Sequence, residues 1–170
     1  SFVAEDVLDY PLGPRSRFSE IIHKQGREPA GRLLRLAEVS AEPRIAELLG
    51  LRRGAKVVLA ERLAMADGRP VALGAHHFPA ARFGRIAALL RADPSITKAL
   101  AACGVPDYRR QVTRITARMP TGEEAAMLAQ SRARPVLVSE AVNVDSERRP
   151  VDATLTRYAA GRAQLVVGEG

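Results

Sequence analysis

The sequence predicts an α+β domain in which helices flank a mostly antiparallel sheet. Two pairs of extended segments are joined by turn residues, short stretches with helix-capping residues lie between them, and few β-α-β patterns occur. Strands joined by short turns, without a helix after every strand, are typical of this class. A length of 170 residues fits one compact domain, which we expect to span residues 1–170.

The N-terminal part is predicted to contain a helix, a strand and a second helix. Residues 16–25 begin with a serine hydroxyl suited to capping a helix and are followed by Gly26, which can end a helix in the left-handed conformation. An extended segment is expected over 32–40. A short helix is then expected over 43–49, stopped by Gly50.

A β-hairpin is predicted in the middle of the chain. Residues 56–66 and 70–78 both alternate in polarity, and they flank the pair Asp67-Gly68. An Asp-Gly pair between extended segments is a strong hairpin signal, because both residues tolerate the positive φ that a tight turn needs.

Two helices are predicted after this hairpin. Asp93 is expected to cap a helix with a proline in its first turn, and Gly104 is placed to end it. Thr121 and Glu124 match a capping box, in which each side chain bonds a free amide at the helix start, and this helix should reach about Gln130.

The C-terminal part is predicted to form a second hairpin and a last strand. Segments 135–145 and 150–158 flank the polar turn 146–149, and a strand is expected over 162–168.

The net charge of +7 and the high isoelectric point raise the question of nucleic-acid binding. The arginines are spread as singles and pairs, without a run of five or more like charges, and aromatic residues are too few for a base-stacking surface. We therefore expect a solvated arginine-rich surface, with a few arginines available for a small anion, and no direct contact of this chain with DNA.

The sequence also narrows the cellular compartment and the cofactors that can be expected. No window approaches the roughly 18 to 20 apolar residues of a membrane span, and the acidic N-terminus does not match a signal peptide, so a cytoplasmic chain without membrane contact is expected. Cys103 is the only cysteine, which excludes an internal disulfide and a cysteine-based zinc site. We predict no metal and no cofactor, and Cys103 is expected to fill apolar space.

Candidate ligand contacts occur at the start of the first helix. Free amides near residues 16–19, beside Arg17 and the Ser19 hydroxyl, could hold an anion, although simple helix capping explains the same residues. His76 and His77 are adjacent in a predicted strand, so they should face opposite sides and cannot share a metal ion. One of them is expected to face a pocket, and a packed or solvated histidine is the alternative.

Other polar groups carry weaker signals. Residues 107–110 (Asp-Tyr-Arg-Arg) could contact a ligand, and a solvated strand start is the favoured interpretation. The sequence contains no nucleophile elbow and no glycine-rich phosphate loop, so an enzymatic function has no named residues to support it.

A resemblance to a known family covers essentially the whole chain. Its motifs occur in order at Leu8–Ser19, Gly26–Pro29, Arg62–Pro70 (Arg-Leu-x-x-x-Asp-Gly-x-Pro), His77–Pro79, Ser95–Leu100, Arg114–Arg118, Glu123–Leu128 and Pro150–Tyr158. With this order and spacing, the chain resembles the UTRA effector domain of GntR-type transcription regulators of the HutC branch.

The resemblance implies a fold, a function and a site. The fold is the chorismate-lyase-like α+β architecture, with helices around a buried ligand cleft. The implied function is control of a repressor by a small, often phosphorylated anion, in a homodimer that contacts DNA only through an N-terminal winged-helix domain absent from this chain. The implied contacts are the amides of Phe18 and Ser19 and the side chains of Arg62, Ser95, Asp152 and Tyr158.

Two positions depart from the family's pattern. Many relatives have a second arginine where this chain has Ala64, and commonly an acid near Gly74. The lost arginine should weaken bidentate anion binding, so a sugar phosphate is less expected than a smaller or differently charged ligand, with Arg17 or His76 as compensating groups. A lyase-type enzyme on the same fold and a purely dimerising module are the alternatives.

Overall fold

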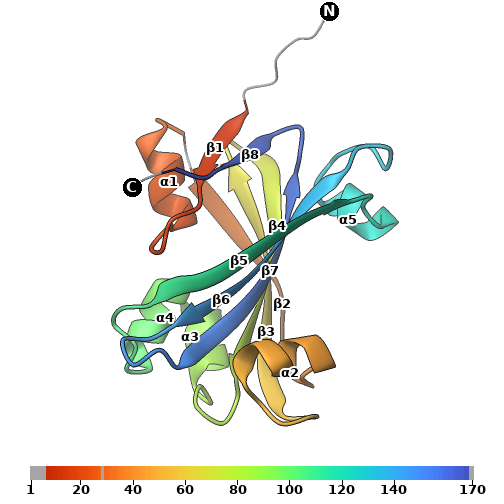
Figure 1. Ribbon diagram of the computed structural model, residues 1–170. Coiled ribbons are helices and arrows are strands. Elements are labelled where there is room, and N and C mark those ends of the chain that lie inside the picture. The colour runs from red at the N-terminus through yellow and green to blue at the C-terminus, as the bar shows by residue number, and fades with distance from the viewer. Residues whose placement is uncertain (1–6, 28, 169–170) are drawn as a thin grey trace, which may run out of the picture.

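The computed structural model describes residues 7–27 and 29–168 (Figure 1). The described elements are β1 (Leu8–Pro11), α1 (Phe18–Lys24), β2 (Pro29–Ser40), α2 (Pro43–Leu49), β3 (Lys56–Ala66), β4 (Arg69–Pro79), α3 (Ile86–Ala92), α4 (Ile96–Ala102), β5 (Arg109–Arg118), α5 (Gly122–Met127), β6 (Val136–Val144), β7 (Pro150–Ala159) and β8 (Ala163–Val166).

A six-stranded sheet in the order β2-β3-β4-β7-β6-β5 forms the centre of the molecule (Figure 1). Every neighbouring pair in this sheet is antiparallel. The strands β1 and β8 form a separate parallel pair that lies at one end of the sheet with α1 (Figure 1). The fold is therefore the predicted α+β class, with β7 placed between two strands that precede it in the sequence.

Register assigns each side chain to one of two sheet faces. His76 on β4 is opposite Ala60 on β3 and Thr154 on β7, so these three residues share a face. We call it the front face. The alternate residues of the same strands, such as Leu63 and Leu73, lie on the opposite face, which we call the back face.

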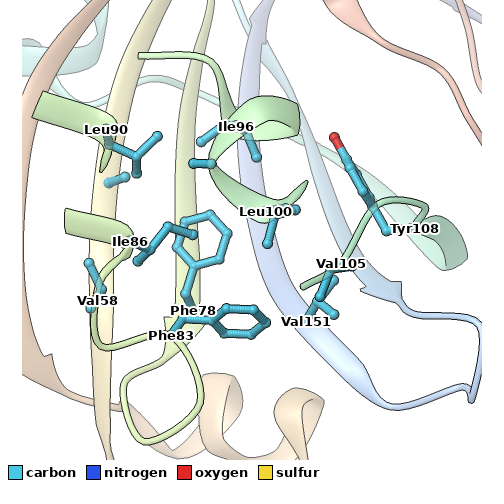
Figure 2. Close-up of a cluster of buried hydrophobic side chains, with 12 residues drawn as sticks. Val58, Phe78, Phe83, Ile86, Leu90, Ile96, Leu100, Val105, Tyr108 and Val151 are labelled. Carbon is cyan, nitrogen blue, oxygen red and sulfur yellow. The ribbon is translucent and has the colours of Figure 1, made fainter. Parts of the chain in front are cut away.

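Two apolar clusters cover the front face at its two ends. At one end α3 and α4 pack on the sheet through Ile86, Leu90 and Leu100, against Phe78 and Val151 (Figure 2). At the other end α1 and the β1/β8 pair pack on the sheet through another set: Leu8, Tyr10, Ile21, Ile22, Ala72 and Tyr158. The front face is thus covered at both ends by different elements.

The back face is covered by α2 and α5. Ile45, Ala46 and Leu49 of α2 pack against Val57 and Ala153. Near α5, a second back-face cluster consists of Leu63, Leu73, Leu128 and Val136. The back face is therefore covered by two packed apolar clusters.

Both predicted hairpins are confirmed. Asp67 and Gly68 have φ values of 50° and 74°, and they connect β3 to β4. The second hairpin joins β6 and β7 around the turn 145–149. The helix over 43–49 and its end at Gly50, with φ 65°, are also as predicted.

Three helix boundaries differ from the predictions. The first helix starts at Phe18, and its N-cap is Arg17, which makes no side-chain cap, instead of Ser16, because the Ser16 hydroxyl donates to the carbonyl of Pro11. Ser95, not Asp93, caps α4 by accepting from the amide of Lys98. The last helix, α5, ends at Met127, short of Gln130.

The capping box at α5 is only half formed. The Thr121 hydroxyl accepts from the amide of Glu124, as predicted. The Glu124 carboxylate, however, accepts from the guanidinium of Arg118 through both oxygens, each at 3.0 Å. The ion pair with Arg118 therefore replaces the second hydrogen bond of a capping box, in which the Glu124 carboxylate would accept from the amide of Thr121.

No helix among the described residues is long and apolar enough to cross a membrane.

Candidate functional site

A pocket with a volume of about 400 Å³ lies on the front face, between the two apolar clusters. Its floor is formed mainly by alternate residues of β3, β4 and β7, and three of them, Ala64, Ala72 and Gly74, have little or no side chain. Its walls come from the residues around the start of α1 and from the segment between α3 and α4. Small residues in the middle of the face leave the space that the clusters at its ends do not fill.

Arg17 stands in the pocket wall, just before α1. Its Nη2 donates to the carbonyl oxygen of Tyr108 at 2.7 Å, and its guanidinium lies 3.7 Å from the centre of the Tyr108 ring. Beside it, Arg15 bonds both carboxylate oxygens of Asp107, and the amide of Arg110 donates to the carbonyl of Pro14. The segment before α1 is therefore tied to the start of β5 along one side of the pocket.

Phe18 lines the pocket as the first residue of α1. The first amide of this helix that bonds back into it is that of Ile21, so the amides of Phe18 and Ser19 precede the helical bonds. The side chain of Ser19 lies outside the described part of the structure, and the prediction for its hydroxyl stays a prediction.

Arg62 extends from β3 into the pocket. Its Nε is buried and has no hydrogen-bond partner among the described residues. Burial lowers the pKa of Arg62 because water no longer stabilises the charged guanidinium, while Tyr108 and Asp93 act in the opposite direction. A buried cation without its full set of bonds is costly unless a partner arrives.

His76 and Asp152 form a hydrogen-bonded pair at the pocket floor. Asp152 is 0% exposed, and its Oδ2 lies 2.9 Å from Nδ1 of His76. Its Oδ1 accepts from the Asn143 amide at 2.6 Å. With Nδ1 donating to the carboxylate, Nε2 of His76 is left beside Gly74, where it can bond a ligand.

His77 faces the other side of the sheet, as predicted. Its Nδ1 lies 3.0 Å from the carbonyl oxygen of Ala153. Burial lowers the pKa of His77, which favours the neutral ring.

Ser95 and Tyr158 occupy different parts of the pocket. Ser95 lies at the start of α4, and its hydroxyl is used as the helix cap. Tyr158 lies on β7 beside Tyr10, with the two ring centres 5.5 Å apart. Burial raises the pKa of Tyr158 far above its usual value, so its hydroxyl stays neutral and is suited to hydrogen bonding rather than charge.

The structure brings seven of the eight predicted site residues to one pocket: Arg17, Phe18, Arg62, His76, Ser95, Asp152 and Tyr158. It also adds Tyr108 and Arg110, which were expected in a solvated strand start. Nε and Nη1 of Arg110 are buried without a hydrogen-bond partner among the described residues. The sequence signal that could have identified Arg110 was the pair Arg109-Arg110 at the start of an alternating strand.

The pocket favours an anion. Arg17, Arg62 and Arg110 line it, together with the carboxylates of Asp93 and Asp152. Both carboxylates already have partners within the protein, since Asp93 bonds Lys98 and the Ser95 amide. No group of three or more His, Cys, Asp or Glu side chains in the described ranges is placed to hold a metal ion.

Comparison with known families decides the classification. The family model described as the UTRA domain matches residues 24–164. The chain belongs to the UTRA domain family. UTRA domains are the effector-binding domains of GntR-family transcription regulators, so the resemblance seen in the sequence is confirmed.

Curated relatives of this UTRA chain are HTH-type transcription regulators. One, from Rhizobium meliloti, is 38% identical over 161 residues, which are 95% of this chain and 66% of that protein. The transcriptional repressor PhnF of Mycolicibacterium smegmatis is 26% identical over 160 residues, which are 94% of this chain and 65% of PhnF. The chain thus spans slightly less than two thirds of the length of these relatives.

Solved structures confirm the UTRA fold. The crystal structure of PhnF from Mycobacterium smegmatis has a TM-score of 0.85 at 24% identity and covers 96% of this chain and 72% of PhnF. The isolated effector domain of the same protein has a TM-score of 0.80 at 23% identity and covers 95% of this chain and 99% of that domain.

Proposed function

We propose that this chain is the ligand-sensing domain of a bacterial transcription repressor and binds a small anion in the front-face pocket. The expected ligands are a phosphonate, phosphate or a phosphorylated metabolite. The observation that carries the proposal is Arg62, which lines a pocket of about 400 Å³ and whose buried Nε lacks a partner among the described residues. A volume in this range is typical of small-molecule sites.

The surrounding groups divide the work of recognition. Arg62 supplies charge-assisted hydrogen bonds to the anion, and the amides of Phe18 and Ser19 add donors from the helix start. His76, held by Asp152, and the neutral Tyr158 are suited to the hydroxyl or amine groups of the rest of the ligand. Ala64 and Gly74 leave room where larger side chains would stand.

Binding is tested by calorimetric titration of phosphate, methylphosphonate and glucose 6-phosphate into the wild-type chain and two variants. Arg62→Gln should weaken the best anion roughly 10- to 100-fold, because it removes a charge-assisted bond of about 1.5–3 kcal/mol. Arg157→Gln is the matched control: Arg157 also has a buried Nε without a partner among the described residues, but it lies on the back face. An absence of binding by the wild type would refute the proposal.

Control of DNA binding requires the full-length regulator. We propose that the chain acts as a cytoplasmic homodimer and that the anion shifts an equilibrium between two arrangements of attached DNA-binding domains. A ligand can do this only through different affinities for the two arrangements. Operator affinity should therefore change when the anion is added, and an unchanged affinity across the panel would contradict sensing.

The enzymatic alternative has one specific feature in its favour, since a histidine paired with a buried carboxylate resembles a general base. We nevertheless expect no turnover. Incubation with chorismate should release no pyruvate, and release at a catalytic rate would replace the sensing proposal by a lyase.

A further inference from the structure

Two arginines with unused donors enter the pocket from different strands. Arg62 is on β3, and Arg110 is at the start of β5. Both line the pocket, and both have buried nitrogens without a hydrogen-bond partner among residues 7–27 and 29–168. Leaving a charged donor buried and unbonded costs free energy, so such groups are expected where a ligand supplies the missing acceptors.

The protein's own acids do not serve these two arginines. The Asp152 carboxylate is bonded by Asn143 and His76, and Asp93 is bonded by Lys98. Arg17, the third arginine in the pocket, already donates to the Tyr108 carbonyl. All three arginines keep their charge, but in this pocket the buried nitrogens without a partner among the described residues belong to Arg62 and Arg110.

The two guanidinium groups act on separate parts of the pocket. Three strands, β4, β7 and β6, lie between β3 and β5, which at the usual strand spacing puts their backbones roughly 19 Å apart across the sheet. Tyr108 and Asp93 are the groups that raise the pKa of Arg62 against the effect of burial. Arg110 instead acts on the hydroxyls of Tyr10 and Tyr158 and favours their ionised forms against the effect of burial.

We infer that Arg110 forms a second anion subsite, and that the ligand carries two separate acidic groups, one bound by Arg62 and the other by Arg110. This inference rests on the proposed function, because it assigns the chemical class of the ligand in the same pocket. The neutral hydroxyls of Tyr10 and Tyr158 beside Arg110 bond each other, which leaves one of the two O–H groups to donate to the second acidic group. A diacid with a short linker, such as a phosphonocarboxylate, has this chemistry.

A matched ligand series tests the inference on the whole chain. The probes are methylphosphonate and the ω-phosphonocarboxylates with two to five carbons, each compared with its carboxamide, which has the same shape without the second charge. The best phosphonocarboxylate should bind at least about tenfold more tightly than its carboxamide, and Arg110→Gln should abolish this ratio. Arg62→Gln should weaken acid and amide alike, and Arg157→Gln should change neither.

Stability separates ligand binding from a structural role. Without ligand, the melting temperature of Arg110→Gln should equal or exceed that of the wild type, because the variant removes a buried charge while its backbone bond to Pro14 remains. A lower melting temperature with an intact acid-to-amide ratio would overturn the inference. Equal loss of acid and amide binding in Arg110→Gln would overturn it too, since both arginines would then hold one anion.

The outcome is distinguishable from failure of the proposed function. If no anion binds the wild type, the proposed function fails. If methylphosphonate binds but no phosphonocarboxylate exceeds its carboxamide, the sensing proposal stands and the second subsite is refuted.

Discussion

The two faces of the central sheet are made by the same strands but serve different purposes. On β4, the back-face residues Leu73 and Ala75 are buried in apolar packing, whereas the front-face residues Gly74 and His76 line a pocket. Alternation along one strand can therefore encode a packed layer and a binding site at once. Substitutions on the back face should therefore change stability, whereas substitutions at neighbouring front-face positions should change ligand binding.

The largest expected effect is on the back face. Leu128 is fully buried in the cluster with Leu63, Leu73 and Val136. Leu128→Ala should lower the free energy of unfolding by about 2–5 kcal/mol, measured by urea denaturation, because it leaves a cavity. Affinity of the folded variant for methylphosphonate should stay at the wild-type value. A parallel loss of affinity would show that the two faces are not separable.

A second prediction concerns Asp145, in the turn of the hairpin that joins β6 and β7, two strands that contribute to both faces of the sheet. Asp145, 6% exposed, holds its turn: burial raises its pKa, but the Arg149 amide, the Arg82 guanidinium and the Glu147 amide outweigh burial and lower the pKa to about 2. Because its pKa is lower in the folded state, the Asp145 carboxylate stabilises the fold fully at pH values above 3.8, the pKa in the unfolded chain. This stabilisation is lost as the pH falls toward 2.

The expected loss at Asp145 is at most about 2 kcal/mol between pH 5 and 2, from about 1.36 kcal/mol per pKa unit. Urea denaturation across this range should show a smaller slope for Asp145→Asn than for the wild type. An identical pH dependence would mean that Asp145 has an ordinary pKa in the folded protein.

The smallest effects are expected at two glycines of the pocket. A Cβ at Gly74 would lie 3.8 Å from Nε2 of His76, an ordinary contact, so Gly74→Ala should raise stability by about 0.5–1 kcal/mol. A Cβ at Gly31 would lie 3.0 Å from Nη2 of Arg62, which must then move. Gly31→Ala should therefore weaken methylphosphonate binding more than Gly74→Ala in calorimetric titration, and the reverse order would contradict the role of Arg62.

The sequence predicted those parts of the fold that depend on local chemistry. The turn at Asp67-Gly68 and the helix end at Gly50 need a positive φ, which few residues adopt easily. The short β1 was missed because its partner, β8, is far away in the sequence. Helix α3 was missed because Arg85, before its first residue, makes no side-chain cap.

Most of the site was found through resemblance, but Arg110 was not. A bulge between Arg110 and Val112 shifts the register, so Arg110 pairs with Asn143 on the front face while Val112 pairs with Val142. Simple alternation would put Arg110 and Val112 on the same face, and one extra residue reverses that relation. Such a shift depends on pairing with β6 and leaves no mark in the local sequence.

The strand order also has a consequence for how the molecule is made. Strand β7 lies between β4 and β6, and it is synthesised after both. Until β7 leaves the ribosome, the chain holds two separate ribbons whose inner edges are open to mispairing. Contacts this distant in sequence favour slow folding. The pocket floor is completed only when β7 joins the ribbons, so a nascent chain cannot form its binding site before β7 has been synthesised.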